Sequence, residues 1–438
     1  MQSSLSPRIG VATLSSPMEV GADRALKAAE DLAGLLQQAG CDVVTLGSIN
    51  TPDAAAAAGR KLTEAHVAAV VLAAASWFED YLVFDLIEES DVPVLFWPLP
   101  GMETGALCGT QQVTACLKQL EKPGMTVFGP IKKGANLERA MNFLRAAALF
   151  RRLRRARIGL AGQRVRGMSE VAVNEFALKK TIGPRVVPVD MVGLLNNARA
   201  TDQAEKQSLW SQVKSSAGVV KVPDDAGQFA AGMTLAIRQV VQREGLSGLA
   251  FGCYPDFMGY ACLAASLLAD EGILIGCEGD VNGVVGMLML TLLTGQPVHN
   301  TDWLDPMTDE SVVFSHCGSG SYALAERQKD ITLAPVRLAN QGVCSLFPAK
   351  VGPVTLINLM PSGDGYQLAV LEGEALATDM VFPGNPLRVK FQPPVREIIA
   401  WIHDEGIGHH WMAGYGHVAA ELNDWAAITG RGLRLIRL

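Results

Sequence analysis

The chain has 438 residues, a formal net charge of −7, and a composition that is 49% hydrophobic and 18% charged. This length exceeds one ordinary hydrophobic core, so we expect two or three domains, and the apolar content excludes a disordered protein. The negative charge argues against a nucleic-acid partner. No apolar run is long enough for a membrane span and the N-terminus lacks a signal-peptide pattern, so we expect a cytoplasmic protein without membrane contact.

The first part of the chain alternates strand-like and helix-like patterns. We expect strands at 8–14, 41–47, 66–75 and 92–97 and helices at 19–39 and 53–65. Near-continuous apolar strands in βαβα order predict a parallel sheet covered on both faces. We assign this domain to residues 1–155.

The pattern then restarts, because "RIGLAG" at 157–162 echoes "RIGVAT" at 8–13. A second doubly wound domain is predicted over 156–335. Its expected strands are 157–162, 185–190, 246–254 and 273–280, and its expected helices are 168–181, 202–215, 226–243 and 257–270.

From about residue 335 the chain changes to short alternating runs separated by Gly, Pro and Ser. "SGDG" at 362–365 is typical of a hairpin turn between two strands. The predicted fold is therefore α/β, with two doubly wound Rossmann-like domains followed by a small antiparallel β-barrel-like C-terminal domain at 336–438.

Carboxylates flank an apolar helix predicted at 283–294. Glu278 follows "ILIGC" at the end of the strand predicted at 273–280, and Asp302 follows "QPVHNT", the next predicted strand. Ligands in open parallel sheets bind beyond the carboxyl ends of the strands, so we expect both carboxylates at one sheet edge, with the helix as the crossover. Asp280 suits the N-cap of that helix. Because burying a carboxylate is costly without a cation, the pair predicts a cation site.

Histidines gather near these carboxylates and near the C-terminus, although each one taken singly can also be a structural residue. Carboxylates with neutral imidazole and no CxxC pair suit Mn²⁺ or a similar divalent ion rather than zinc held by thiolates. The loop "GQRVRGM" at 162–168 lacks the spacing of a dinucleotide site. Its Arg164 and Arg166 could meet an anionic or polyol ligand, or cap a domain interface.

The chain resembles the L-fucose isomerase family and, more loosely, L-arabinose isomerase. The 277–303 segment, with its two spaced carboxylates, is the most specific match. The other matching segments, in family order, are "GTQQVTACLKQL" (109–120), "GQRVRGM" (162–168), "RVVPVDM" (185–191), "CYPDF" (253–257), "HCG" (316–318) and "GYGHV" (414–418).

The resemblance implies a metal-dependent aldose–ketose isomerase that acts on an open-chain sugar through a cis-enediol. Glu278 and Asp302 would bind Mn²⁺, or another divalent cation, and act as the acid/base pair. His410, rather than His409, would be the third metal ligand. The resemblance also implies a homo-oligomer, with a hexamer expected and sites near subunit boundaries. Candidate substrate contacts are His316, Arg164, Tyr254 and Trp77.

Two alternatives stay open. The position that matches a substrate-binding arginine of fucose isomerases is Ala12, and the chain is shorter than those enzymes. Both differences favour an isomerase acting on a modified sugar, either sulfonated or branched and acid-bearing. The other alternative is a non-catalytic sugar-binding homologue, although all three expected metal positions are filled.

Overall fold

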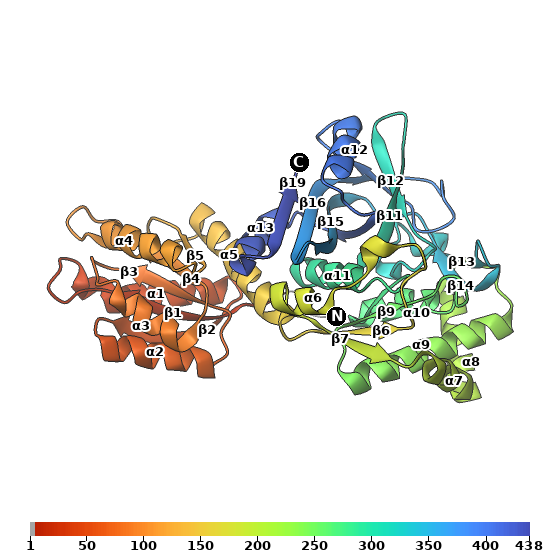
Figure 1. Cartoon of the computed structure of the whole chain (residues 1–438), viewed down its shortest axis with the longest axis horizontal. Helices are drawn as coiled ribbons and strands as arrows, with labels where there is room; N and C mark the ends of the chain where they lie inside the picture. The colour runs from red at the N-terminus through yellow and green to blue at the C-terminus, as the bar shows by residue number, and fades with distance from the viewer. Residues whose placement is uncertain (1–4) are drawn as a thin grey trace. The chain divides into compact units, whose positions relative to one another are not determined.

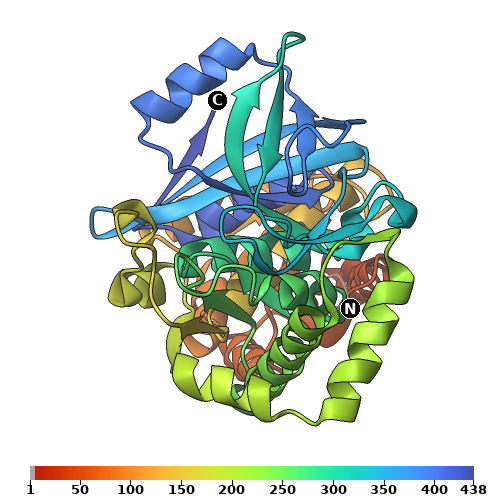
Figure 2. The same cartoon turned by 90° about the vertical axis from the view of Figure 1, so that its right-hand side faces the viewer.

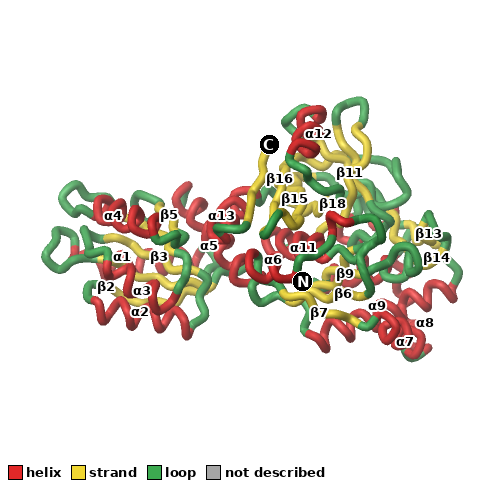
Figure 3. Tube along the Cα trace, viewed as in Figure 1, coloured by secondary structure: helices red, strands yellow, loops and turns green. Residues whose placement is uncertain are grey.

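The computed structural model describes residues 5–438, which form parallel sheets covered by helices together with an antiparallel sheet (Figures 1 and 3). The chain divides into two compact units. One holds residues 5–152 with 420–430, and the other holds 153–419 with 431–438. The three-domain division, the hexamer and the cytoplasmic location stay predictions.

The N-terminal unit contains a five-stranded parallel sheet in the order β2-β1-β3-β4-β5. Every residue of β3 is buried, so both faces of the sheet are covered, as the sequence predicts. The first helix begins at Ala25 rather than residue 19, because Gly21 lies in the left-handed region and interrupts the helical pattern. The elements are β1 (Arg8–Leu14), α1 (Ala25–Gln38), β2 (Asp42–Ile49), α2 (Pro52–Glu64), β3 (Ala69–Ala74), α3 (Tyr81–Ser90), β4 (Val94–Pro98), α4 (Ala106–Gln119), β5 (Gly124–Thr126) and α5 (Ala135–Leu153).

The second unit opens with a four-stranded parallel sheet in the order β10-β9-β6-β7, and a small sheet, β14-β13-β8, lies apart from it. The elements are β6 (Arg157–Ala161), α6 (Glu175–Thr181), β7 (Arg185–Val189), α7 (Met191–Ala200), α8 (Gln203–Ser216), β8 (Val219–Val220), α9 (Asp224–Glu244), β9 (Gly248–Phe251), α10 (Cys262–Leu268), β10 (Leu274–Gly276), β13 (Thr332–Val336) and β14 (Gln341–Leu346).

Two of these elements are shorter than the sequence predicts. Asn174 caps α6 by accepting a hydrogen bond from the Ala177 N–H at 3.0 Å, so the helix predicted from residue 168 begins at Glu175. Strand β10 ends at Gly276, so Glu278 lies in the loop after the strand rather than in it.

An antiparallel sheet completes the second unit and closes on itself. Its strands pair in the order β15-β18-β11-β12-β17-β16, and β16 pairs back with β15, while β19 extends beside β16. The predicted hairpin at 362–365 is confirmed, because Ser362 pairs with Gly365. Figure 2 shows this sheet above the green helices. The elements are β11 (Val298–Pro306), β12 (Ser311–Ser315), β15 (Gly352–Ser362), β16 (Gly365–Leu376), β17 (Leu387–Lys390), α12 (Val395–Asp404), β18 (His410–Tyr415), α13 (Ala419–Thr429), which passes into the N-terminal unit, and β19 (Leu433–Arg437).

Helix α11 (Val281–Thr294) lies between the parallel sheet and the antiparallel sheet (Figure 1). It contacts β6, β9 and β10 on one side and β11, β15 and β18 on the other. Residues 281–293 are all buried, which explains why the helix is apolar on every face. Apolar as α11 is, no helix within residues 5–438 combines the length and hydropathy needed to cross a membrane.

The crossover predicted around this helix is wrong. Strand β11, which carries Asp302, pairs antiparallel with β12 and β18 and takes no part in the parallel sheet. Helix α11 therefore joins two different sheets. A short apolar strand has the same pattern in either kind of sheet, and only its pairing partners decide between them.

Candidate active site

Three neighbouring strands of the antiparallel sheet bring Asp302, His410 and His316 together. Asp302 of β11 lies directly opposite His410, the first residue of β18, and opposite Ser315, the last residue of β12. Directly opposed residues of an antiparallel pair project to the same face, so Asp302 and His410 are neighbours. His316 follows Ser315, where the chain leaves the strand.

The residues after Asp302 and His410 support the site from the other face of the sheet. Side chains alternate along a strand, so Trp303 and Trp411 point away from the site. The Trp303 ring stacks on Phe391 with ring centres 6.1 Å apart and meets Phe314 edge-on at 5.1 Å. Trp411 is fully buried in the same apolar core. This close packing fixes the strand ends that carry the polar side chains.

Glu278 enters the site from the loop between β10 and α11. Its backbone is in the left-handed region, with φ of 62°, which costs free energy for a residue with a side chain. The next residue, Gly279, also has positive φ, and a Cβ atom there would lie 2.6 Å from the Gln163 backbone oxygen. Such a strained, crowded turn indicates that the position of the Glu278 carboxylate matters to the protein.

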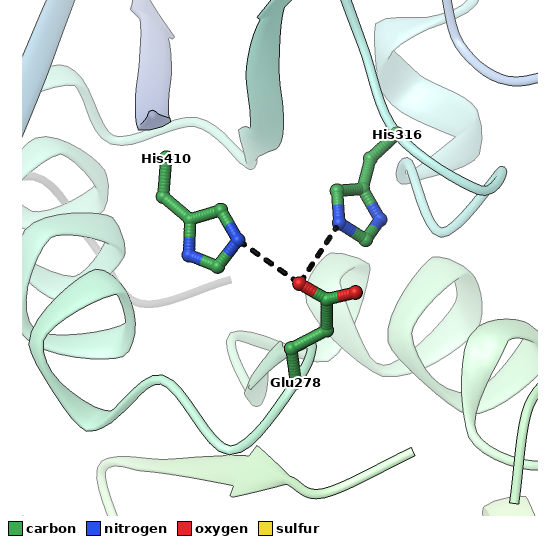
Figure 4. Close-up of side chains that lie close together, drawn as sticks. All are labelled: Glu278, His316 and His410. Carbon is green, nitrogen blue, oxygen red and sulfur yellow. Dashed lines mark hydrogen bonds and ion pairs between the residues drawn. The ribbon is translucent and has the colours of Figure 1, made fainter. Parts of the chain in front are cut away.

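The four side chains form a compact cluster. The Glu278 Oε2 atom lies 3.1 Å from His410 Nε2 and 3.9 Å from His316 Nε2 (Figure 4). Asp302 completes the group, with Oδ1 3.7 Å from His410 Nε2 and Oδ2 3.9 Å from His316 Nε2. Asp302 is also the most accessible, with 30% of its side chain exposed against 13% for Glu278. Asp302 is therefore the member of the cluster that is most open to solvent.

The charges in this cluster depend on one another. Burial alone would raise the pKa of Glu278, but hydrogen bonds and charges from His316 and His410 outweigh burial and hold that pKa well below its ordinary value. Burial would lower the pKa of His410, but Asp280, Glu278 and Asp302 raise it to about 9. For His316, burial is likewise outweighed, because Cys277, Cys317 and Glu278 raise its pKa. Protons on the imidazoles thus balance the carboxylates in the metal-free protein.

The cluster fits a divalent cation. One donor atom from each of Glu278, His316 and His410 lies within 4.8 Å of the others, and the same holds for Asp302, His409 and His410. The Asp302 Oδ1 atom is buried without a hydrogen-bond partner within the described chain, and so is the other ring nitrogen of His316, Nδ1. A buried carboxylate oxygen without a donor is costly unless a cation meets it. Oxygen and imidazole donors without thiolate suit Mn²⁺ or a similar ion.

His410 is held on two sides by residues that are distant from it in the sequence. Its Nδ1 atom lies 2.8 Å from Asp280 Oδ2, and its backbone oxygen accepts a hydrogen bond from Asn358 Nδ2 at 2.7 Å. Asp280 also caps α11 as predicted, through Oδ1 and the Gly283 N–H at 2.9 Å. These contacts join residues 130 and 52 positions apart in the sequence, so no local motif could reveal them.

Of the C-terminal histidines, His410 points into the cluster, as the resemblance implies. His409 lies beside it and belongs to the second donor group; its Nδ1 atom lies 2.7 Å from Glu170 Oε1, and its ring contacts the His410 ring, with centres 4.2 Å apart. His417 lies 3.7 Å from Glu374. His316, predicted as a substrate contact, belongs to the donor cluster itself.

The other predicted substrate contacts are spread over the chain. Arg164 lies in the loop after β6, which touches the site through a 3.2 Å hydrogen bond from the Val165 N–H to the Glu278 carbonyl oxygen. Tyr254 is 46% exposed in the loop after β9. Trp77 belongs to the N-terminal unit, where its indole N–H donates to Gln112 at 3.2 Å. Their roles stay predictions.

No protein-family model matches the chain. It is 26% identical over 375 residues to a sulfoquinovose isomerase of Alkalicoccus urumqiensis, covering 81% of this chain and 83% of that protein. It is 27% identical over 350 residues to a sulfoquinovose isomerase of Priestia aryabhattai, covering 77% and 78%. It is 23% identical over 350 residues to a sulfoquinovose isomerase of Clostridium sp. (strain MSTE9), covering 75% of this chain and 77% of that protein. Similarity to named sugar isomerases over most of the chain confirms the prediction that it is an enzyme of the aldose–ketose isomerase class.

Proposed function

We propose that the protein is a metal-dependent isomerase that converts a sulfonated aldose of the sulfoquinovose kind into its ketose. The observation that carries the proposal is the close approach of Glu278, Asp302, His316 and His410. Among their atoms, Asp302 Oδ1 is buried without a hydrogen-bond partner in the described chain. The relatives favour a sulfonated sugar. From the sequence alone, a sulfonated sugar is the alternative, and a sugar of the L-fucose or L-arabinose type is the main expectation.

The two carboxylates supply proton transfer. Glu278 is ionised at neutral pH because the two imidazoles outweigh its burial, so it can accept a proton. One carboxylate removes the proton from C2 of the open-chain aldose to give a cis-enediolate, the hydroxyl proton moves from O2 to O1, and a proton is returned to C1 to give the ketose. Both carboxylates lie 3.9 Å from Nε2 of His316, so either is placed to serve as the base.

The proposed cofactor is Mn²⁺ or another divalent cation held by Glu278, Asp302, His316 and His410. A bound cation would polarise the sugar carbonyl and stabilise negative charge that develops on the enediol oxygens. The chain's own part is to orient these donors. The packed strands fix Asp302 and His410, and the strained loop fixes Glu278.

A substrate panel tests this function. We expect purified protein with Mn²⁺ to convert a sulfonated aldose with a kcat/KM at least about tenfold above that for L-fucose, L-arabinose or the unsulfonated aldose, because hydrogen bonds to a charged group contribute more than roughly 1.4 kcal/mol. NMR in D₂O would follow ketose formation and the appearance of deuterium at C1 of the ketose. Equal kcat/KM for L-fucose would contradict the proposed substrate. Binding without turnover for every sugar would support a non-catalytic protein instead.

Arg164 is the residue that we expect to contact the sulfonate. Its Nη1 donates to the backbone oxygens of Val165 at 3.1 Å and Met168 at 3.4 Å, which orient the guanidinium, and no carboxylate within residues 5–438 pairs with it. Arg164→Gln should raise KM for the sulfonated aldose about tenfold to a hundredfold, since a charged hydrogen bond is lost, and should leave the unsulfonated aldose unaffected.

The matched control for this prediction is Arg166→Gln. Arg166 is exposed in the same loop, so its replacement removes the same charge from a neighbouring position. We expect steady-state kinetics close to the parent enzyme. If Arg166→Gln raises KM for the sulfonated aldose and Arg164→Gln does not, the assignment of Arg164 is wrong.

A further inference from the structure

Both carboxylate oxygens of Asp280 accept a hydrogen bond, and the two donors have different purposes. Oδ1 accepts from the Gly283 N–H at 2.9 Å, which caps α11. Oδ2 lies 2.8 Å from Nδ1 of His410, a residue of the antiparallel sheet. Asp280 is only 4% exposed. One side chain therefore joins the start of the buried helix to a donor of the proposed metal centre.

Capping alone does not explain a buried aspartate. An N-cap needs one acceptor, and Asp, Asn and Ser serve about equally well. Asp202 caps α8 in this way, accepting from the N–H groups of Ala204 and Glu205, but it is exposed. A carboxylate is far costlier to bury than a hydroxyl or an amide, unless a donor partner compensates. The contact with His410 offsets the cost of burying the Asp280 carboxylate.

The contact also sets which ring nitrogen of His410 is free. When Nδ1–H donates to Asp280, the lone pair of the neutral ring lies on Nε2. Nε2 is the atom that faces Glu278 at 3.1 Å and Asp302 at 3.7 Å. Asn358 holds the backbone of His410 at the same time. Asp280 and Asn358 thus fix the orientation and the tautomer of the His410 ring, so that the lone pair of Nε2 faces the cluster.

We propose that Asp280 is a positioning residue that presents His410 Nε2 to the divalent cation, in addition to capping α11. The inference rests on the metal centre of the proposed function. A carboxylate can satisfy both donors at once, because each oxygen accepts. An amide has only one acceptor, so asparagine can serve Gly283 N–H or His410 Nδ1–H but not both. If asparagine keeps the cap, its N–H₂ faces Nδ1 and imposes the tautomer with hydrogen on Nε2, which cannot bind a cation.

The test compares the full-length parent with Asp280→Asn, Asp280→Ser and the control cap variant Asp202→Asn. Mn²⁺ dissociation constants are measured by titration calorimetry, at a temperature at which circular dichroism shows each protein folded. We expect the constant to rise about 10- to 100-fold in both Asp280 variants, as for other residues that orient metal ligands, and to stay unchanged in Asp202→Asn. The serine variant keeps the helix cap but loses the contact with His410, so it tests the effect of that contact on Mn²⁺ binding even if Asp280→Asn does not fold.

A second measurement reports on the ring itself. In protein with ¹⁵N-labelled histidine and bound Zn²⁺, a diamagnetic probe, the parent should show His410 with hydrogen on Nδ1, assigned by loss of the signal in His410→Gln. Asp280→Asn should lose that pattern. A parent that binds no Mn²⁺ overturns the metal centre and this inference with it. A parent that binds, with Asp280 variants that match its dissociation constant and its ¹⁵N shifts, overturns the inference alone and leaves Asp280 as a cap.

Discussion

Glu278→Gln and Asp302→Asn each lower kcat by about 10²- to 10⁴-fold or more, the range expected when a positioned proton-transfer group is removed. Each amide keeps the shape of the side chain but removes a base and a negative charge. The loss should be larger where the cation also departs, because both carboxylates belong to the proposed donor set. The measurements are steady-state kinetics with saturating Mn²⁺ and exchange of the C2 proton in D₂O.

Glu374→Gln is the matched control for this pair. Glu374 also lies beside a histidine, His417 at 3.7 Å, but outside the cluster, and 57% of its side chain is exposed. We expect parent activity for this variant. In chelator, Glu278→Gln should melt below the parent, because two buried imidazoles lose their ionic partner. If either site variant exchanges the C2 proton at nearly the parent rate, that carboxylate is not the base.

The metal-free protein should lose stability as the pH rises from about 6.5 to 9. The pKa of His410 is raised from its ordinary 6.5 to about 9 in the fold, so its contribution is fully present below 6.5 and lost as the pH passes 9. The shift corresponds to roughly 3 kcal/mol in the free energy of unfolding, at about 1.4 kcal/mol per pH unit. Glu278 acts oppositely. Its depressed pKa stabilises the fold above its ordinary 4.5, and that contribution is lost as the pH falls below it.

Manganese should offset this loss. A histidine must release its proton to bind a cation, so Mn²⁺ binds more tightly, and stabilises the fold more, as the pH rises. Urea unfolding at pH 6, 7, 8 and 9, in chelator and in excess Mn²⁺, measures both effects. His410→Asn is the control, because it removes the titrating ring, and its metal-free stability should depend less on pH. A pH dependence identical to that of the parent would show that other groups are responsible.

The sequence predicts the parts of this site that depend on local pattern. The apolar strands indicated the parallel sheets, "SGDG" indicated the hairpin, and the family resemblance selected Glu278, Asp302 and His410 as neighbours. The reason given for their meeting was wrong, since Asp302 reaches the cluster through antiparallel pairing with His410.

Three features could not be predicted from sequence because each depends on distant neighbours. The left-handed backbone of Glu278 exists only where Gly279 packs against Gln163. His316 enters the donor cluster because the chain turns at the end of β12. Asp280 reaches His410 across 130 positions of sequence. The position of Asp280 before an apolar run predicts the start of α11, but it carries no information about β18, which holds His410 and comes much later in the chain.

The sealed position of α11 has a consequence for the rate of turnover. Glu278 precedes this helix on the side of the parallel sheet, whereas Asp302, His316 and His410 belong to the antiparallel sheet. Opening the molecule between the two sheets would expose a helix with thirteen consecutive buried residues, so we expect the proposed donor groups to keep their relative positions while sugars exchange. We therefore expect sugar entry and product release to depend on loops beside the site, such as 162–168, where the Val165 N–H donates to the Glu278 carbonyl oxygen. Two enzymes with identical metal donors can therefore have different turnover rates, because the motion of loops that carry no donor limits how fast sugars enter and leave.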